Sequence, residues 1–96
     1  MQYLIKVLDY ENAIEKRMEV REKHLENAKK MLAAGQIINA GAIIKDDKMI
    51  GSTFFMEFYS QKEIDEWLKH EVYVLNKVWD MDTFEMHNVK LLAKNI

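Results

Sequence analysis

The fold is decided by residues 36–59, QIINAGAIIKDDKMIGSTFFMEFY. This stretch holds two runs of apolar, β-branched and aromatic residues, 36–44 and 49–59, and the charged residues KDDK at 45–48 separate them. Two runs of this kind joined by a short polar segment predict a β-hairpin with a tight turn.

The second run is apolar on both of its alternating faces. Phe54 and Met56 fall on one face, and Phe55 and Tyr59 fall on the other. A sheet that faces water on one side alternates apolar and polar residues. We therefore expect something to cover the second face, and a second copy of the chain in a two-fold dimer is the simplest candidate.

Before the hairpin, residues 2–9 (QYLIKVLD) alternate as a strand does, and a helical period then continues until Gly35. Asn12 with Glu15 three residues later resembles a capping box, which predicts the start of this helix. The apolar positions that repeat at helical spacing are Ile14, Met18, Leu25, Ala28 and Leu32.

After the hairpin, Ser60 and Glu63 form a second capping-box pattern, which predicts a helix from residue 61. Residues 70–82 fit either a further helical turn leading into a loop or a strand, and we favour the short helix. Residues 83–92 alternate loosely and predict a final strand.

The predicted order is β-α-β-β-α-β in one domain spanning residues 1–96. It gives an α+β fold with a four-stranded antiparallel sheet and two helices on one face.

Composition excludes several classes of protein. With 49% hydrophobic residues the chain has enough apolar surface to fold. A net charge of −2 argues against a nucleic-acid partner. We expect no membrane association, because no stretch approaches the ~20 apolar residues of a membrane span and the first residues do not form a signal peptide. The absence of cysteine favours the cytoplasm.

The first predicted helix carries Arg17, Arg21 and His24 on one side, at spacings of four and three. Arg21 occupies a place where an apolar residue would make the apolar stripe continuous. A guanidinium facing inward needs a carboxylate partner or an anionic ligand. The alternative is a structural ion pair, or an arginine whose stem lies along the core while its head reaches water.

His24 could transfer protons near neutral pH, or it could be an ordinary core or surface histidine. We expect no metal, because no two of His24, His70 and His87 have the i, i+4 spacing of a helical zinc site. The glycines do not form a phosphate-binding pattern, and no other cofactor motif is present.

Together, Tyr3, Ile5 and Asp9, the motif E-K-R-x-x-V-R-x-x-H-L at 15–25, Ala40-Gly41 and Gly51-Ser52-Thr53 resemble the YCII-related family of small bacterial proteins. The resemblance implies a ferredoxin-like fold of the dimeric α+β barrel group, in which two sheets pack face to face in a homodimer. One branch of the family resembles a dehydrochlorinase that acts on a hydroxylated aromatic ring.

By position, the resemblance implies that the family histidine is His24, with Arg17 and Arg21 nearby. The family aspartate lies in an Asp-Pro-Tyr tripeptide, and Glu71-Val72-Tyr73 stands in its place. The resemblance thus implies catalytic roles for His24 and Glu71. Substrate contacts are expected from the side chains Arg17, Arg21, Ser52 and Tyr73.

Three functions remain open. The first is a small lyase, isomerase or dehydrohalogenase that uses a His-carboxylate pair on a small anionic or aromatic substrate. The second is a noncatalytic dimeric module that binds a small anionic ligand, which the change to glutamate at 71 and the short hairpin turn favour. The third is a structural interaction domain without a ligand.

Overall fold

A computed structural model of the chain describes residues 1–94, so the last two residues of the expected domain lie outside the described part. The order of elements is β-α-β-β-α-β with short additions, as predicted. The elements are β1 (Gln2–Asp9), α1 (Ile14–Ala33), β2 (Ile37–Lys45), β3 (Lys48–Glu57), α2 (Gln61–His70), α3 (Val72–Leu75), β4 (Trp79–Val89) and the 3₁₀ helix η1 (Leu92–Lys94).

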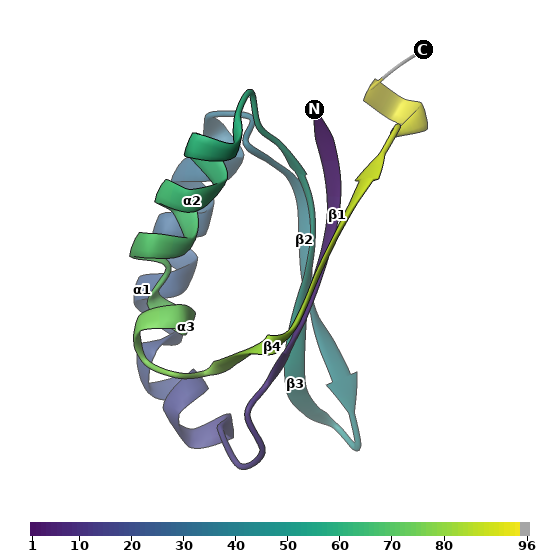
Figure 1. The fold of residues 1–96 in the computed structure, drawn as a ribbon. Coiled ribbons are helices and arrows are strands. Elements are labelled where there is room, and N and C mark those ends of the chain that lie inside the picture. Colours follow the sequence, from purple (N-terminus) through teal and green to yellow (C-terminus); the bar gives the residue numbers. More distant parts are fainter. Residues whose placement is uncertain (95–96) are drawn as a thin grey trace.

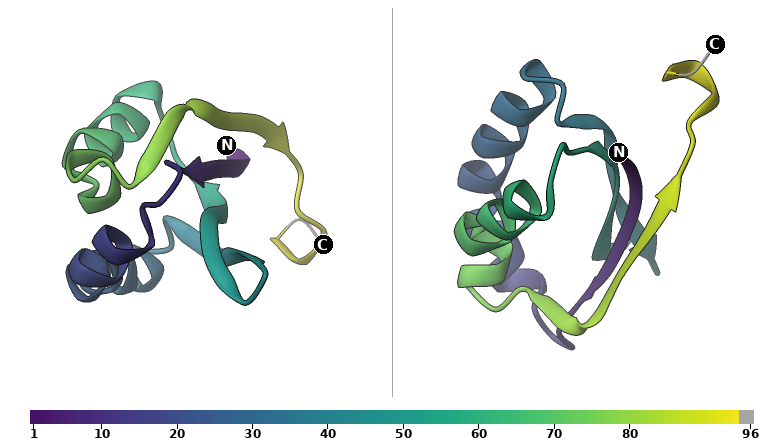
Figure 2. Two further views of the ribbon diagram at one scale, coloured as in Figure 1. Left: turned by 90° about the horizontal axis from the view of Figure 1, so that it is seen from below. Right: turned by 45° about the horizontal axis from the view of Figure 1, so that its top comes forward.

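The four strands form one antiparallel sheet in the order β2-β3-β1-β4. The three α-helices lie together on one face of the sheet (Figure 1), and the two views of Figure 2 show the same arrangement. The α+β class and the ferredoxin-like topology are therefore confirmed. Within the described residues, no helix has the length and apolar character needed to cross a membrane.

The hairpin turns where the sequence predicts, because β2 ends at Lys45 and β3 begins at Lys48. Asp46 and Asp47 between them both have positive φ, 51° and 63°. A two-residue hairpin loop of this kind needs positive φ at both positions, and aspartate tolerates that conformation better than most residues.

The helix ends follow the predicted signals only in part. The side chain of Ser60 caps α2 by accepting from the Glu63 N–H, as predicted. The capping box at Asn12 is wrong: α1 has Ala13 at its N-cap position and no side-chain cap. Asn12 has a left-handed φ of 64° and so belongs to the preceding turn.

The segment after α2 contains the short helix that we favoured, but it also contains the start of the last strand. The strand β4 begins at Trp79, earlier than the predicted residue 83, and ends at Val89. Its register against β1 shifts between Lys6 and Leu8. This irregularity, typical of a β-bulge, interrupts the alternation from which strands are recognised.

The core lies between the sheet and the helices. Its centre is a group of aromatic rings in which Phe54, Tyr73 and Trp67 all pack around Trp79, with ring centroids 5.7–6.1 Å from it. In the described residues, no α-helix covers the opposite face of the sheet (Figure 1), and Phe55 on that face is 37% exposed.

Candidate active site beside the first helix

The face of α1 that points into the protein carries two polar residues. It differs from the face predicted by the apolar residues that repeat at helical spacing. Arg17 and His24 are the buried residues of this helix, 4% and 7% exposed. Met18 and Leu32, which the stripe placed inside, are 51% and 53% exposed. The expectation that Arg21 is the inward arginine is therefore wrong, because Arg21 is only half-buried.

His24 and Glu71 are hydrogen-bonded to each other in the interior. The distance between His24 Nδ1 and Glu71 Oε1 is 2.6 Å, and both side chains are more than nine-tenths buried. Glu71 lies at the junction between α2 and α3, where Oε1 also accepts from the backbone N–H of Tyr73 at 3.2 Å. The glutamate thus holds the histidine and caps the short helix with the same oxygen.

Two aromatic rings fix the orientation of the imidazole. The His24 ring stacks on Tyr73 with centroids 3.8 Å apart and an interplanar angle of 9°. The edge of Trp79 meets it at 6.1 Å. Because Nδ1 bonds to Glu71, Nε2 is the nitrogen left for a substrate, and it has no hydrogen-bond partner among residues 1–94. This is the geometry of a general base oriented by a carboxylate.

Arg17 is the buried arginine, and the end of β1 supplies its partner. Its Nη1 lies 2.9 Å from both carboxylate oxygens of Asp9, and its Nη2 donates to Ser52 Oγ at 3.1 Å. Burial raises the pKa of Asp9 above its ordinary value, although the hydrogen bond and charge of Arg17 and the charge of His24 lower it. Arg17 is thus held by an internal ion pair, with only Nε buried and unbonded in the described chain.

Arg17 also contributes to the site through Tyr73. Its guanidinium carbon lies 4.8 Å from the centroid of the Tyr73 ring, on which His24 also stacks. Burial raises the pKa of the Tyr73 phenol above 10.0, although the charges of Arg17 and Arg21 lower it. The hydroxyl of Tyr73 therefore keeps its proton at neutral pH and can donate a hydrogen bond.

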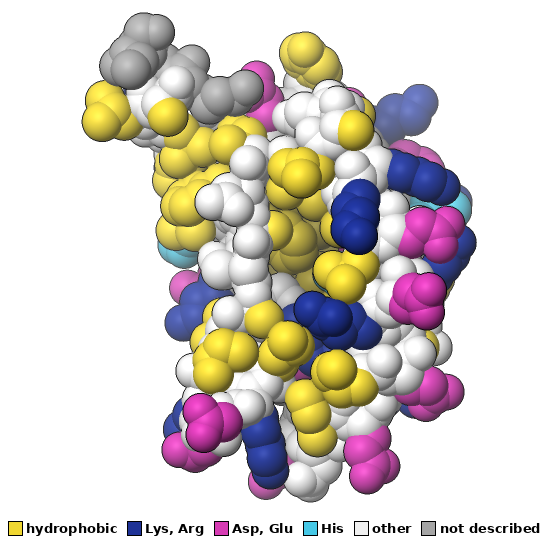
Figure 3. Space-filling model, turned by 180° about the vertical axis from the view of Figure 1, so that it is seen from behind, with side chains coloured by type: hydrophobic (Ala, Val, Ile, Leu, Met, Phe, Trp, Pro, Cys, Tyr) yellow, Lys and Arg dark blue, Asp and Glu magenta, His cyan; other side chains and the backbone are white. Residues whose placement is uncertain are grey.

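A cavity of about 240 Å³ joins these groups. Seen from behind (Figure 3), the molecule is hollowed between the helices and the sheet, and apolar side chains line the hollow. The residues that line the cavity are Arg17, Arg21, His24, Leu25, Ala28, Ala40, Gly41, Ala42, Met49, Ser52, Phe54 and Tyr73. All four predicted substrate-binding residues and His24 therefore line one cavity, and Glu71 lies directly behind the histidine.

Two of these polar groups have no partner in the described residues. Arg21 makes no hydrogen bond or ion pair, and the hydroxyl of Tyr73 makes none, although the tyrosine as a whole is 1% exposed. Ser52 differs, because its oxygen accepts from both Arg17 and Trp79 Nε1, each at 3.1 Å. Ser52 therefore positions its neighbours and retains only its own hydroxyl proton for a ligand.

Small residues of β2 form part of the cavity wall. Ala40, Gly41 and Ala42 line it, and a Cβ added to Gly41 would meet no atom within 4 Å. β2 is an edge strand of the sheet, so this part of the wall lies at the sheet's edge.

Two residues of the site, Asp9 and Trp79, were not predicted as functional. Asp9 ends the first predicted strand eight residues before Arg17, and it is one of the residues that carry the family resemblance. Trp79 stands in an irregular stretch of the sequence, at the start of β4, and its Nε1 donates to Ser52 Oγ.

Comparisons with known proteins agree with this fold. The chain is 32% identical over 81 residues to an uncharacterised protein of Haemophilus influenzae, covering 77% of this chain and 83% of that one. A solved structure has a TM-score of 0.83, with 20% identity and full coverage of both chains. It is 5-chloro-2-hydroxyhydroquinone dehydrochlorinase from Burkholderia phenoliruptrix AC1100 in complex with 2,5-dihydroxybenzoquinone, and this likeness shows the fold. A sequence model of the YCII-related domain matches residues 1–86, and the chain therefore belongs to the YCII-related family.

Proposed function

We propose that this protein is a small lyase, isomerase or dehydrohalogenase that acts on a hydroxylated aromatic or other small anionic substrate. His24 is the general base and acid, and Glu71 orients it and stabilises its protonated form. Arg21 and the hydroxyl of Tyr73 hold an anionic or phenolic oxygen of the substrate. Arg17 adds positive charge behind the Tyr73 ring.

The observation that carries this proposal is the 2.6 Å hydrogen bond between His24 and Glu71 at the wall of a cavity. The hydroxyl of Tyr73 has no hydrogen-bond partner among residues 1–94, and Tyr73 lines the same cavity as the unpaired Arg21. Both groups can therefore donate hydrogen bonds to a ligand. A substrate with one or two acidic oxygens would satisfy both.

This arrangement supports an elimination in which the substrate loses one proton and one halide ion. His24 Nε2 takes a proton from a hydroxyl or carbon of the substrate, and the electron pair of the broken bond forms a new double bond. Halide leaves with the electron pair of its bond to carbon. The proton on His24 then passes to water. Arg21 stabilises the negative charge that develops on the substrate oxygen.

We also propose that two copies of the chain pack their open sheet faces together. The supporting feature is the apolar outer face, where Phe55 is exposed beside the partly buried Leu4. Phe55→Glu would place a charge at the centre of that interface. Sedimentation should show a dimer for the wild type and a monomer for the variant, and a wild type that is monomeric at all concentrations would contradict the pairing.

A substrate screen tests the enzymatic proposal. Hydroxylated and halogenated single-ring aromatics are incubated with the protein, and 2,5-dihydroxybenzoquinone serves as a binding probe. We expect halide release that disappears in His24→Ala and persists in the surface variant Lys29→Ala. Turnover that survives in His24→Ala would reject the assigned base. Binding that depends on Arg21, without turnover of any compound, would identify a noncatalytic module instead.

A further inference from the structure

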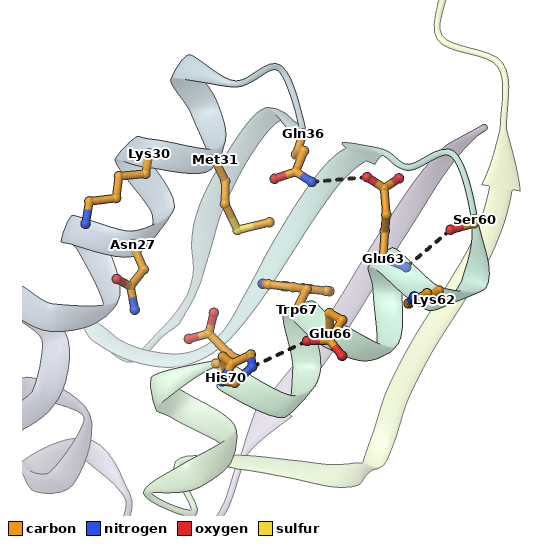
Figure 4. Close-up of a pocket in the computed structure, with 11 residues that line it drawn as sticks. Asn27, Lys30, Met31, Gln36, Ser60, Lys62, Glu63, Glu66, Trp67 and His70 are labelled. Atoms are coloured by element: carbon orange, nitrogen blue, oxygen red, sulfur yellow. Dashed lines mark hydrogen bonds and ion pairs between the residues drawn. The ribbon is translucent and has the colours of Figure 1, made fainter.

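A second cavity, of about 540 Å³, lies between α1 and α2 (Figure 4), and Glu71 is among the residues that line it. Its volume falls within the range of about 300–1,000 Å³ that is typical of small-molecule sites. The side chains that line it are Asn27, Lys30, Met31, Gln36, Ser60, Lys62, Glu63, Glu66, Trp67, His70 and Glu71. We call it the interhelical cavity.

The indole N–H of Trp67 is a donor without a hydrogen-bond partner in the described part of the chain, although the residue is largely buried. Trp67 is 8% exposed, and its Nε1 makes no hydrogen bond to any residue in 1–94. Figure 4 shows this nitrogen directed from α2 toward α1, where Asn27 and Met31 lie. A buried indole N–H usually has an acceptor, and Trp79 has one in Ser52. The interhelical cavity therefore lacks an acceptor that a ligand could provide.

Glu71 supplies the complementary group. Its Oε1 is bonded to His24 and to the backbone of Tyr73. Its Oε2 accepts no hydrogen bond from the described residues, although Glu71 is 6% exposed and lines the cavity. A carboxylate oxygen with free lone pairs at the wall of a cavity favours a charged donor.

The other acidic side chains of the cavity already have partners. Glu66 pairs with His70 at 3.4 Å, and Glu63 accepts from Gln36 and from the backbone of Tyr59. Of the two lysines, Lys30 is 74% exposed and lies near Glu26, so its charge is in water. Glu71 is thus the buried acidic residue of the cavity lining, and its Oε2 has no partner among the described residues.

We propose that the interhelical cavity binds a small primary amine with an apolar body and a neighbouring oxygen, such as an amino alcohol. Its ammonium group donates to Glu71 Oε2, its oxygen accepts from Trp67 Nε1, and its apolar part packs on Met31 and the indole ring. Because one carboxylate serves both cavities, an amine bound here also perturbs His24. The site itself does not depend on the proposed chemistry.

Phenylalaninol is the probe, and 3-phenyl-1-propanol, which lacks only the amine, is the matched control. Binding is followed by the indole N–H signals of the two tryptophans and the ring signals of His24 in NMR spectra. We expect phenylalaninol to shift Trp67 and His24 strongly and the alcohol to bind about tenfold more weakly, as loss of one charge-assisted hydrogen bond implies. No shift of Trp67 at millimolar phenylalaninol, or equal binding of the alcohol, would overturn the proposal.

Three variants test whether phenylalaninol binds in the interhelical cavity. Glu71→Gln should weaken phenylalaninol binding about tenfold, and Asn27→Phe, which fills the cavity from α1 without touching the pair, should abolish it. Lys29→Ala, on the exposed side of α1, should have no effect. Unchanged binding in both of the first two variants would refute the site.

His24→Ala separates this proposal from the enzymatic one. It should abolish turnover and retain phenylalaninol binding. If the wild type turns over no compound but still binds phenylalaninol through Glu71, the enzymatic proposal fails and the interhelical site stands.

Discussion

His24 and Glu71, which are 47 residues apart in sequence, meet at 2.6 Å through Nδ1 and Oε1. The side chain of Glu71 spans this distance from the junction between α2 and α3, and the Tyr73 N–H donates to its carboxylate. One change at this position therefore alters the charge and the orientation of the imidazole together.

Changing Glu71 should lower turnover more than substrate affinity. Glu71→Gln keeps the size but removes the charge that stabilises the protonated ring, so we expect kcat to fall about 100-fold or more while KM changes little. Glu71→Asp should retain more activity, because the carboxylate remains. Steady-state kinetics on the best substrate of the screen provide the measurement. A KM effect without a kcat effect would assign Glu71 to binding.

The ion pair between Asp9 and Arg17 should be a major contributor to stability. Asp9→Asn leaves a buried guanidinium without its counter-charge, which costs about 3 kcal/mol of the free energy of unfolding. Urea denaturation measures this cost. The exposed pair Lys16–Glu19, at 3.2 Å, is the matched control, and Glu19→Gln should change stability by less than about 1 kcal/mol.

A double-mutant cycle isolates the interaction. Removal of both charges in Asp9→Asn/Arg17→Gln should cost less than the sum of the single variants by about 1 kcal/mol or more. Additive effects would mean that the two side chains stabilise the fold separately.

Arg21 should matter for ligand binding and not for folding. It is half-buried and has no ion pair in the described part of the chain. Arg21→Gln should therefore weaken binding of an anionic ligand by about tenfold to a hundredfold, as expected for loss of a charged hydrogen bond. The free energy of unfolding should change by about 0.5 kcal/mol at most. Calorimetry measures the change in ligand binding, and urea denaturation measures the change in the free energy of unfolding. A strongly destabilised variant would assign Arg21 to the core.

Tyr73 should make stability fall at alkaline pH. Burial raises the pKa of its phenol above 10.0, so the folded state keeps a proton that the unfolded state loses. The folded state then binds more protons above pH 10.0, and the free energy of unfolding decreases as pH rises. Tyr73→Phe removes the titrating phenol, so the free energy of unfolding of this variant should decrease less steeply as pH rises. Parallel pH profiles of the two proteins would contradict the burial effect.

The fold could be predicted because its signals are local. The hairpin at 36–59, the cap at Ser60 and the end of α1 shortly before Gly35 each depend on neighbouring residues. The bulge in β4 could not be predicted, because it arises from the pairing of two distant strands. The cytoplasmic location and the pairing of two copies stay predictions.

The sequence predicted several of the side chains that meet beside α1, but not their arrangement and not the parts of Asp9 and Trp79. Counting apolar residues along α1 placed Arg21 inside, whereas Arg17 and His24 are inside because Asp9 and Glu71 satisfy them there. Such compensation comes from other elements of the fold, and the helix sequence alone does not contain it. A resemblance in motif, in contrast, located both His24 and Glu71.

The tautomer of His24 tests the central claim most directly. In a long-range ¹H–¹⁵N spectrum recorded where the ring is neutral, the proton should reside on Nδ1, donated to Glu71, with Nε2 unprotonated and free to act as a base. In Glu71→Gln this preference should weaken or disappear. A neutral His24 that carries its proton on Nε2 in the wild type would contradict the pair and the mechanism built on it.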